Sequence, residues 1–175
     1  RVQVAGGEVG RNAVVGAVAA ALTLGVVDGH YSGIGGGCFF VIRAADGTLT
    51  CLDGRETAPA ASTRDMYVIG GKLDEQASKT GALAAGVPGA LRAYEHALQK
   101  HGRLKLADLL LPAARIAEDG FIIDEGYARK LAASARELRN FPASAAIFLH
   151  ADGSPLKAGV RLVHKDLAAT YRASA

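Results

Sequence analysis

The stretch from Val14 to Val27 constrains the fold more than any other part of the sequence. It is apolar on nearly every side of a helix. It is also too short, and too rich in alanine and glycine, for a membrane span of about 20 residues. Asn12 can cap such a helix, and Gly25 lies near its expected end. We therefore predict a helix from about Asn12 to Gly25 that is buried all round by other layers of the domain.

After this helix, the six residues from Ser32 to Gly37 include four glycines. We predict a tight turn here, because its backbone needs the conformational freedom of glycine. A phosphate-binding loop is the alternative, but a dinucleotide fingerprint that starts at Gly33 requires glycine where Cys38 stands, and it opens a helix rather than a strand. We expect no nucleotide or other cofactor.

Two strand-like runs, 38–43 and 48–53, follow the glycine turn, and Asp46-Gly47 between them is a strong hairpin signal. A two-residue turn at this pair places Ile42 opposite Cys51. Both faces of the resulting hairpin are apolar, which predicts a sheet that is covered on both sides.

The two cysteines, Cys38 and Cys51, lie on opposite strands of this hairpin. The predicted register separates them by four positions along the ladder, farther than a disulfide tolerates. We therefore predict two free thiols rather than a disulfide.

The rest of the chain is predicted to be mostly helical, with a loop or lid from Met66 to Leu83 that turns at Gly70-Gly71. Pro88 and Pro112 are expected at or near helix starts. The expected helices cover residues 89–100, 105–118, 124–140 and 164–174. A helix, a hairpin, a loop and further helices, in this order, predict an α+β fold or a layered sandwich.

Charge and histidine spacing exclude several classes of function. The formal net charge is only +3, and the densest basic group fits the solvated face of one helix rather than a nucleic-acid stripe. That group consists of Arg129, Lys130, Arg136 and Arg139. No two of the five histidines have the spacing that binds zinc from one helix, so we predict surface histidines and no metal.

The charged segment Asp53-Gly54-Arg55-Glu56 directly follows an apolar strand. Charges at the end of a buried strand are costly unless they are paired or lie at a ligand cleft. The planar fork of Arg55 suits a carboxylate, and Asp53 could hold that fork in place. Two interpretations remain open from the residues alone: a structural ion pair or a carboxylate-binding site.

A series of short motifs, in order along nearly the whole chain, resembles the γ-glutamyltransferase (γ-glutamyltranspeptidase) family. The motifs are Asn12-Ala13-Val14, Ser32-Gly33-Ile34-Gly35-Gly36-Gly37, Asp53-Gly54-Arg55-Glu56-Thr57-Ala58-Pro59, Thr63-Arg64-Asp65-Met66-Tyr67, Gly86-Val87-Pro88-Gly89, Pro112-Ala113-Ala114-Arg115-Ile116-Ala117-Glu118-Asp119-Gly120-Phe121, Ala146-Ile147-Phe148 and Pro155-Leu156-Lys157-Ala158-Gly159. The ordered series is far more specific than any single motif.

The resemblance implies part of an N-terminal-nucleophile hydrolase fold, an αββα sandwich, with residues 1–175 as the N-terminal portion of a large subunit. Family members cut their own precursor and free an N-terminal threonine on the small subunit, which is the partner of the large one. That threonine attacks γ-glutamyl amides such as glutathione, and its own amino group can serve as the base. By family habit, a periplasmic or secreted location is expected.

The family resemblance also assigns a role to Arg55, which by analogy binds the α-carboxylate of the γ-glutamyl group. Asp53 is expected to hold the fork of Arg55 and Glu56 to support the loop, and no catalytic residue is expected within this chain. Alternatives are an amidohydrolase of the same fold with another acyl substrate, such as a cephalosporin-type or oxamate-type enzyme, and a non-catalytic carboxylate-binding module.

Three positions depart from the family pattern. Val15 replaces a usual aspartate, Cys38 stands where glycine is common, and Gly54 replaces a bulky aromatic residue. Gly54 is therefore expected to loosen the packing that orients Arg55. Because Arg1 cannot be the nucleophile, we expect the 175 residues alone to be inactive.

Overall fold

The computed structural model describes residues 12–175, which form two compact units. One unit comprises residues 12–33 and 98–175, and the other comprises residues 34–97. The elements, in chain order, are α1 (Ala13–Val27), β1 (Cys38–Arg43), β2 (Leu49–Gly54), β3 (Val68–Ile69), β4 (Lys72–Leu73), the 3₁₀ helix η2 (Ala82–Ala84), α2 (Ala90–His101), α3 (Leu106–Asp119), β5 (Phe121–Ile122), α4 (Glu125–Leu138), α5 (Pro142–Phe148), β6 (Arg161–Leu162) and α6 (Lys165–Ala173). The arrangement is mixed α+β, as predicted.

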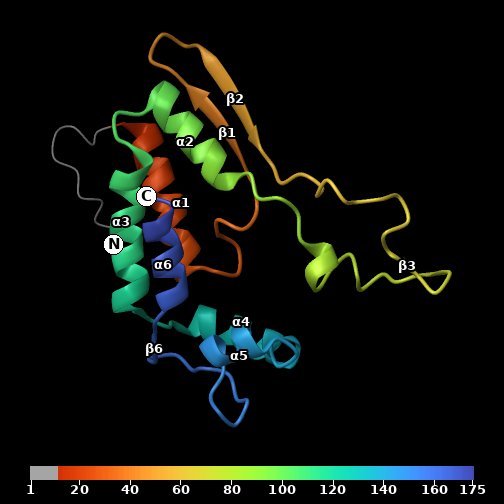
Figure 1. Ribbon diagram of the computed structural model, residues 1–175. Coiled ribbons are helices and arrows are strands. Elements are labelled where there is room, and N and C mark those ends of the chain that lie inside the picture. The colour runs from red at the N-terminus through yellow and green to blue at the C-terminus, as the bar shows by residue number, and fades with distance from the viewer. Residues whose placement is uncertain (1–11) are drawn as a thin grey trace. The chain divides into compact units, whose positions relative to one another are not determined.

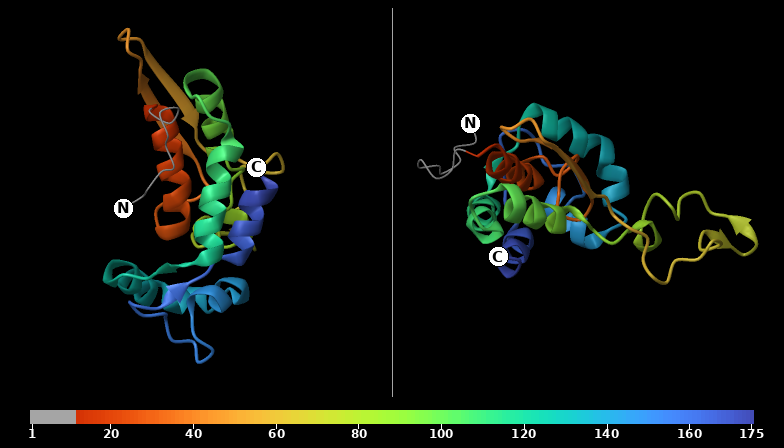
Figure 2. Two further views of the ribbon diagram at one scale, coloured as in Figure 1. Left: turned by 90° about the vertical axis from the view of Figure 1, so that its left-hand side faces the viewer. Right: turned by 90° about the horizontal axis from the view of Figure 1, so that it is seen from above.

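Three helices, α1, α3 and α6, pack together in the larger unit (Figures 1 and 2). The Asn12 side chain caps α1 as predicted, because its Oδ1 accepts hydrogen bonds from the amides of Val14 (2.9 Å) and Val15 (3.1 Å). On the other side, the fully buried Tyr171 of α6 donates its hydroxyl to the carbonyl of Leu22 at 3.1 Å. These two contacts fix one end of α1 and tie its middle to α6.

Helix α1 is not buried all round among the described residues, which corrects the prediction. Four of its apolar side chains are completely buried: Val15, Val18, Leu22 and Val26. A stripe at helical spacing, Ala13, Ala17 and Leu24, is exposed, because no other described segment covers that side. The full burial of Val15 explains why an apolar residue suits this position.

The second core of the larger unit lies around α4 and the short β5–β6 ladder. Its buried residues are Ile123, Tyr127, Leu131 and Leu162. Helix α5, with its proline in the first turn, was not foreseen from the sequence. The other α-helices begin and end within two residues of their predicted bounds, but Pro112 lies inside α3 rather than near its start.

In the smaller unit, the β1–β2 hairpin has a register one residue away from the predicted one. Cys38 pairs with Gly54, and Val41 pairs with Cys51. The reason is the turn: the Ala44 amide bonds to the Thr48 carbonyl at 2.9 Å, which leaves a loop of three residues instead of two. Gly47 takes a φ of 89°, as the third residue of such a loop requires.

A one-residue shift changes which side chains share a face of the hairpin. One face is covered by α2, where the rings of Phe40 and Tyr94 meet edge to face at 5.9 Å. The other face is open in the described chain and carries Phe39, Val41 and Leu49, which are 64%, 76% and 66% exposed. The prediction that both faces are covered is therefore wrong for residues 12–175.

Both cysteines are free, which confirms the prediction although the register behind it was wrong. In the observed register they lie three positions apart along the ladder. The alternating burial also places them on opposite faces, with Cys38 half-buried and Cys51 exposed.

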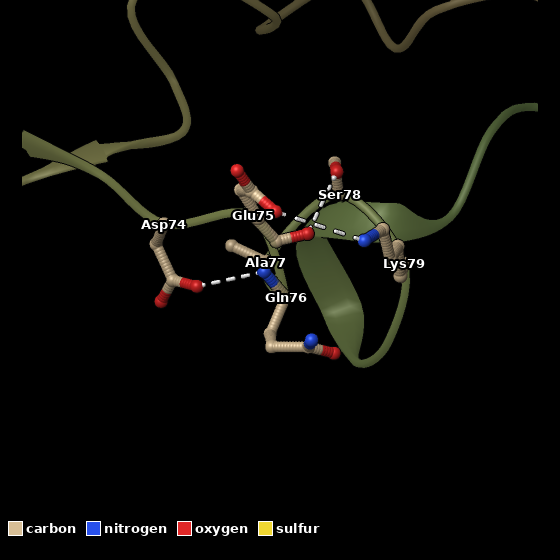
Figure 3. Close-up of polar contacts among 6 residues, drawn as sticks. All are labelled: Asp74, Glu75, Gln76, Ala77, Ser78 and Lys79. Atoms are coloured by element: carbon tan, nitrogen blue, oxygen red, sulfur yellow. Dashed lines mark hydrogen bonds and ion pairs between the residues drawn. The ribbon is translucent and has the colours of Figure 1, made fainter.

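The segment between residues 57 and 87 forms a long loop whose two ends are tied together. Thr57 and Val87 exchange two backbone hydrogen bonds of 3.1 and 2.8 Å. The predicted turn at Gly70-Gly71 is confirmed, with φ values of 61° and 78° that connect β3 to β4. Local hydrogen bonds order the segment after β4, where the Asp74 carboxylate accepts hydrogen bonds from the backbone amides of residues 76 and 77 (Figure 3).

Among the helices of residues 12–175, none is both long and apolar enough to cross a membrane.

Candidate functional site

Arg55 lies directly after the last residue of β2, where the chain turns away from the hairpin. Asp53 holds the turn, because its Oδ1 accepts a hydrogen bond from the backbone amide of Arg55 at 2.9 Å. Asp53 therefore positions the backbone of Arg55, whereas the sequence predicted that it would hold the guanidinium. This leaves the side chain of Arg55 exposed beyond the end of the strand.

Close approach of glycine backbones fixes the segment that carries Arg55. A Cβ atom added to Gly37 would lie 2.7 Å from both the Cα of Arg55 and the amide nitrogen of Glu56. A Cβ atom on Gly89 would lie 2.8 Å from the carbonyl oxygen of Arg55. The Gly36 carbonyl adds two hydrogen bonds of 3.1 Å, from the amides of Gly89 and Ala90 at the start of α2. The backbone around Arg55 is thus packed to a degree that only glycine permits.

Gly54 does not loosen this packing, which corrects the sequence-based expectation. Gly54 is buried, and a Cβ atom there would collide with the Cβ of Ala93 on α2 and lie 3.2 Å from the Sγ of Cys38. Helix α2 therefore occupies the space that a larger side chain at position 54 would need. The small residues at 54 and 93 bring α2 directly against the end of β2.

An open pocket of about 370 Å³ lies where β2 and α2 meet. Its lining residues are Cys51, Leu52, Asp53, Gly54, Arg55, Gly89, Arg92, Ala93 and His96. The pocket brings together the predicted Arg55 and Asp53. It adds Arg92 and His96, which the sequence analysis missed. The signal for them was their spacing of four residues on a predicted helix, immediately after the Gly86–Gly89 motif.

Arg55 makes no ion pair within residues 12–175, so the structural ion pair weighed from the sequence is not formed in this part of the chain. Arg92 bonds to Glu95 on its own helix at 3.0 Å. Glu56 lies outside the pocket lining, where the aliphatic part of its side chain packs against Gly86. Two guanidinium groups and one imidazole thus line a pocket whose lining includes a single carboxylate, that of Asp53. This arrangement favours an anionic ligand.

A second pocket, of about 280 Å³, lies in the larger unit and has a different character. Its lining residues are Gly29, His30, Tyr127, Leu131, Ser134, Glu137, Leu138, Phe141 and Phe148. Burial raises the pKa of Tyr127 to about 12, with a smaller contribution from the Asp28 carboxylate. The His30 ring contacts the Tyr127 ring edge to face at 4.9 Å.

Two histidines of this region are partly buried, which corrects the prediction of surface histidines. The Nε2 atoms of His30 and His164 are both buried and have no hydrogen-bond partner among the described residues. Burial lowers the pKa of each. For His30 the Lys130 cation lowers the pKa further, and the Asp28 carboxylate opposes this effect. Lys130 itself pairs with Asp28 at 3.6 Å and lies over the Tyr31 ring at 3.7 Å.

Comparison with known proteins supports the family resemblance. A glutathione hydrolase proenzyme of Pseudomonas sp. (strain A14) is 42% identical over 165 residues, which cover 93% of this chain and 28% of the relative. An acylase ACY 1 proenzyme of Pseudomonas sp. (strain V22) is 38% identical over 170 residues, covering 93% of this chain and 30% of the relative. The chain thus spans less than a third of the length of these relatives.

The crystal structure of Helicobacter pylori γ-glutamyltranspeptidase matches with a TM-score of 0.87 and 37% identity, over 91% of this chain and 46% of that chain. The fold is therefore that of part of an N-terminal-nucleophile hydrolase. Residues 7–175 match the Gamma-glutamyltranspeptidase family model, and the chain belongs to that family.

Proposed function

We propose that the protein to which these residues belong transfers or hydrolyses the γ-glutamyl groups of glutathione-type donors. One observation supports this most directly: Arg55, in the family motif, lines an open pocket and makes no ion pair within residues 12–175. A planar guanidinium with unused donors suits the α-carboxylate of a γ-glutamyl group. The glutathione hydrolase relatives fit this assignment.

In the proposed reaction, the nucleophile is an N-terminal threonine that lies outside residues 1–175. Its hydroxyl oxygen bonds to the γ-carbonyl carbon while its proton passes to the threonine's own amino group. The amide C–N bond then breaks, and the leaving amine takes that proton. Water or an acceptor amine next attacks the ester and restores the hydroxyl. In this scheme Arg55 binds the donor and holds it in place.

Replacing Arg55 with lysine in the full-length protein tests this role, because lysine keeps the charge and loses the fork. A charge-assisted contact is worth about 1.5–3 kcal/mol, so kcat/KM for a γ-glutamyl donor should fall roughly 10- to 150-fold. Self-cleavage should persist, because processing does not use the carboxylate of the free donor. The exposed Arg103, outside the pocket lining, provides a matched control as Arg103→Lys. A cleaved Arg55→Lys enzyme with parental kinetics would refute the assignment.

We further propose that residues 1–175 form the N-terminal portion of a large subunit and pair with a small subunit from the same precursor. The purified 175-residue chain should then fail to turn over a γ-glutamyl anilide. The intact mass of the full-length product should show two pieces after maturation. An active isolated chain, with activity abolished by Arg55→Ala, would refute this proposal.

The open face of the hairpin fits an αββα sandwich in which the remaining polypeptide supplies further layers. Phe39, Val41 and Leu49 would be costly to leave in water. We therefore expect Cys51, on this face, to react readily with a thiol reagent in the isolated chain and to be protected in the full-length protein. Equal labelling of Cys51 in both proteins would contradict a covered face.

An amidohydrolase with another acyl substrate is the second candidate, and the acylase ACY 1 relative favours it. The two candidate functions differ in whether the donor must carry an α-carboxylate. A γ-glutamyl enzyme should lose activity when that carboxylate is replaced by an amide, whereas an acylase with a neutral acyl group should not. A non-catalytic carboxylate-binding module would remain uncleaved and inactive toward both donors.

We also propose a periplasmic or secreted location. Cell fractionation tests it, with a cytoplasmic marker as control. Recovery of the mature protein with the cytoplasmic marker would contradict the proposal.

A further inference from the structure

The pocket beside Arg55 is lined by more side-chain nitrogen donors than one carboxylate can engage. Arg55 lies at the end of β2, whereas Arg92 and His96 come from α2. These two α2 residues are four positions apart, so they occupy neighbouring places on the same side of the helix. A donor bound at Arg55 alone would leave this second group of nitrogen donors unused.

The position of Arg92 and His96 is fixed by backbone packing rather than by their own side chains. Ala93, next to Arg92, contacts Gly54, and Gly89 lies against the carbonyl of Arg55. Helix α2 therefore cannot move away from the end of β2 without breaking the packing that holds Arg55. The backbone positions that carry the two groups of donors are therefore held relative to each other, so one ligand can contact both groups.

Arg92 already has one partner, because its Nη1 bonds to Oε2 of Glu95. A guanidinium has five N–H donors, so this contact uses a small part of its capacity. The side chain remains 83% exposed, which leaves the rest of the fork accessible. A surface ion pair of this kind contributes about 0–1 kcal/mol to stability, too little to be the main reason for an arginine at this place.

We propose that Arg92 and His96 form a second anion subsite, which binds a carboxylate on the leaving amine of the donor. The proposal rests on the proposed function, in which Arg55 binds the α-carboxylate of the γ-glutamyl group. The preferred donor is then a γ-glutamyl peptide with a free C-terminal carboxylate, and a donor with an uncharged leaving group is used less well. In transfer, an acceptor amine takes the place of the leaving amine, so the same subsite favours acceptors that carry a carboxylate.

The test compares glutathione with glutathione whose C-terminal carboxylate is converted to an amide, using the full-length, self-cleaved protein. The two donors differ only in the group that the proposed subsite recognises. The measured quantity is the kcat/KM for glutathione divided by the kcat/KM for its C-terminal amide. Loss of one charge-assisted hydrogen bond predicts that Arg92→Gln lowers this ratio by about 10-fold, and that His96→Gln lowers it by a smaller factor.

Two control variants separate binding from helix stability. Lys100→Gln removes an exposed cation from the end of the same helix, outside the pocket lining, and should leave the ratio at its parental value. Glu95→Gln removes the ion-pair partner of Arg92 and should keep or raise the ratio. A ratio that falls equally in Glu95→Gln and Arg92→Gln would assign Arg92 to the ion pair alone and overturn the proposal.

The outcomes also distinguish this proposal from the proposed function. If Arg55→Lys weakens turnover of both donors but Arg92→Gln and His96→Gln leave the ratio unchanged, the second subsite is refuted and the γ-glutamyl assignment stands. If Arg55→Lys changes neither donor, the proposed function itself fails. Thermal unfolding of each variant shows whether Arg92→Gln is folded, and Arg92→Lys provides a milder second variant.

Discussion

The pocket at β2 and α2 and the pocket around Tyr127 are built on opposite principles. The pocket at β2 and α2 is lined by exposed charged side chains, and close backbone contacts at glycines hold its shape. The pocket around Tyr127 is lined mainly by apolar and aromatic side chains, and side-chain packing holds its shape. Charges that remain solvated can serve a ligand, whereas buried aromatic and imidazole groups mainly serve stability.

This contrast separates two kinds of mutational effect. In the Arg55 pocket, removing a charge should alter kinetics and change stability little, because the side chains are exposed. In the Tyr127 pocket, removing a side chain should alter stability and leave the kinetics of the folded enzyme nearly unchanged.

The largest expected effect is on the core around Tyr127. Leu131 is 2% exposed and belongs to the buried cluster of α4. Leu131→Ala should lower the free energy of unfolding by about 2–5 kcal/mol, because it removes buried methyl groups and leaves a cavity. Denaturant unfolding of the full-length protein measures this loss. The kcat and KM of the folded fraction for γ-glutamyl donors should stay near the parental values. A rise in KM without a loss of stability would contradict the division between the two pockets.

The next largest effect is expected at Gly89, directly before α2, where the backbone approaches the carbonyls of Gly54 and Arg55. Gly89→Ala places a methyl group against these atoms and should displace Arg55. A displacement of about 1 Å can cost on the order of 100-fold in rate, so kcat/KM for γ-glutamyl donors should fall by about that factor.

Gly35→Ala is the matched control for Gly89→Ala. A Cβ atom on Gly35 meets nothing within 4 Å, and the backbone there does not take a positive φ. Its kinetics should therefore remain close to those of the parent. Equal losses in both variants would mean that the glycine turn, rather than the approach at Gly89, controls activity.

The sequence predicted the local features of the fold more successfully than the long-range ones. The cap at Asn12 and the helix bounds follow from caps and periodicity within a few residues. The hairpin register could not be predicted in this way, because Asp46-Gly47 is compatible with loops of two or three residues, and each loop gives a different register. The burial of His30 and His164 depends on α4, α5 and β5, which are distant in the sequence.

The same distinction applies to the candidate site. Arg55 could be predicted because its motif and the end of its strand lie in one short segment. Arg92 and His96 could be recognised from their spacing as neighbours on one helix, but their place at the site could not, because they join it only through the contact of Ala93 with Gly54. That contact requires two small residues 39 positions apart in the sequence to meet, and no local pattern indicates it.

The smallest expected effect is the pH dependence of stability that arises from His30 and His164. Both folded-state pKa values are lowered, so the unfolded chain binds more protons than the folded chain as pH falls below about 6.5. Stability should therefore be constant above that pH and decline below it, until the folded-state pKa values are passed. The groups that face His30 are Lys130, Asp28 and the Tyr127 ring, and those that face His164 are the rings of Phe121 and Phe148.

The double variant His30→Gln, His164→Gln should flatten this decline, because glutamine does not titrate. Thermal unfolding between about pH 7 and pH 5 measures the effect. This pH window lies above the range in which Asp46 and Asp152 titrate, because hydrogen bonds from Thr48 and Ser154 lower the pKa values of these carboxyl groups from 3.8. His150→Gln, at an exposed position, serves as the control for the loss of a histidine. If the double variant loses stability with falling pH as steeply as the parent does, the buried imidazoles are not the source of the decline. If instead the double variant changes the pH dependence of kcat/KM and not that of unfolding, the pocket around Tyr127 takes part in the reaction, and the division between the two pockets is wrong.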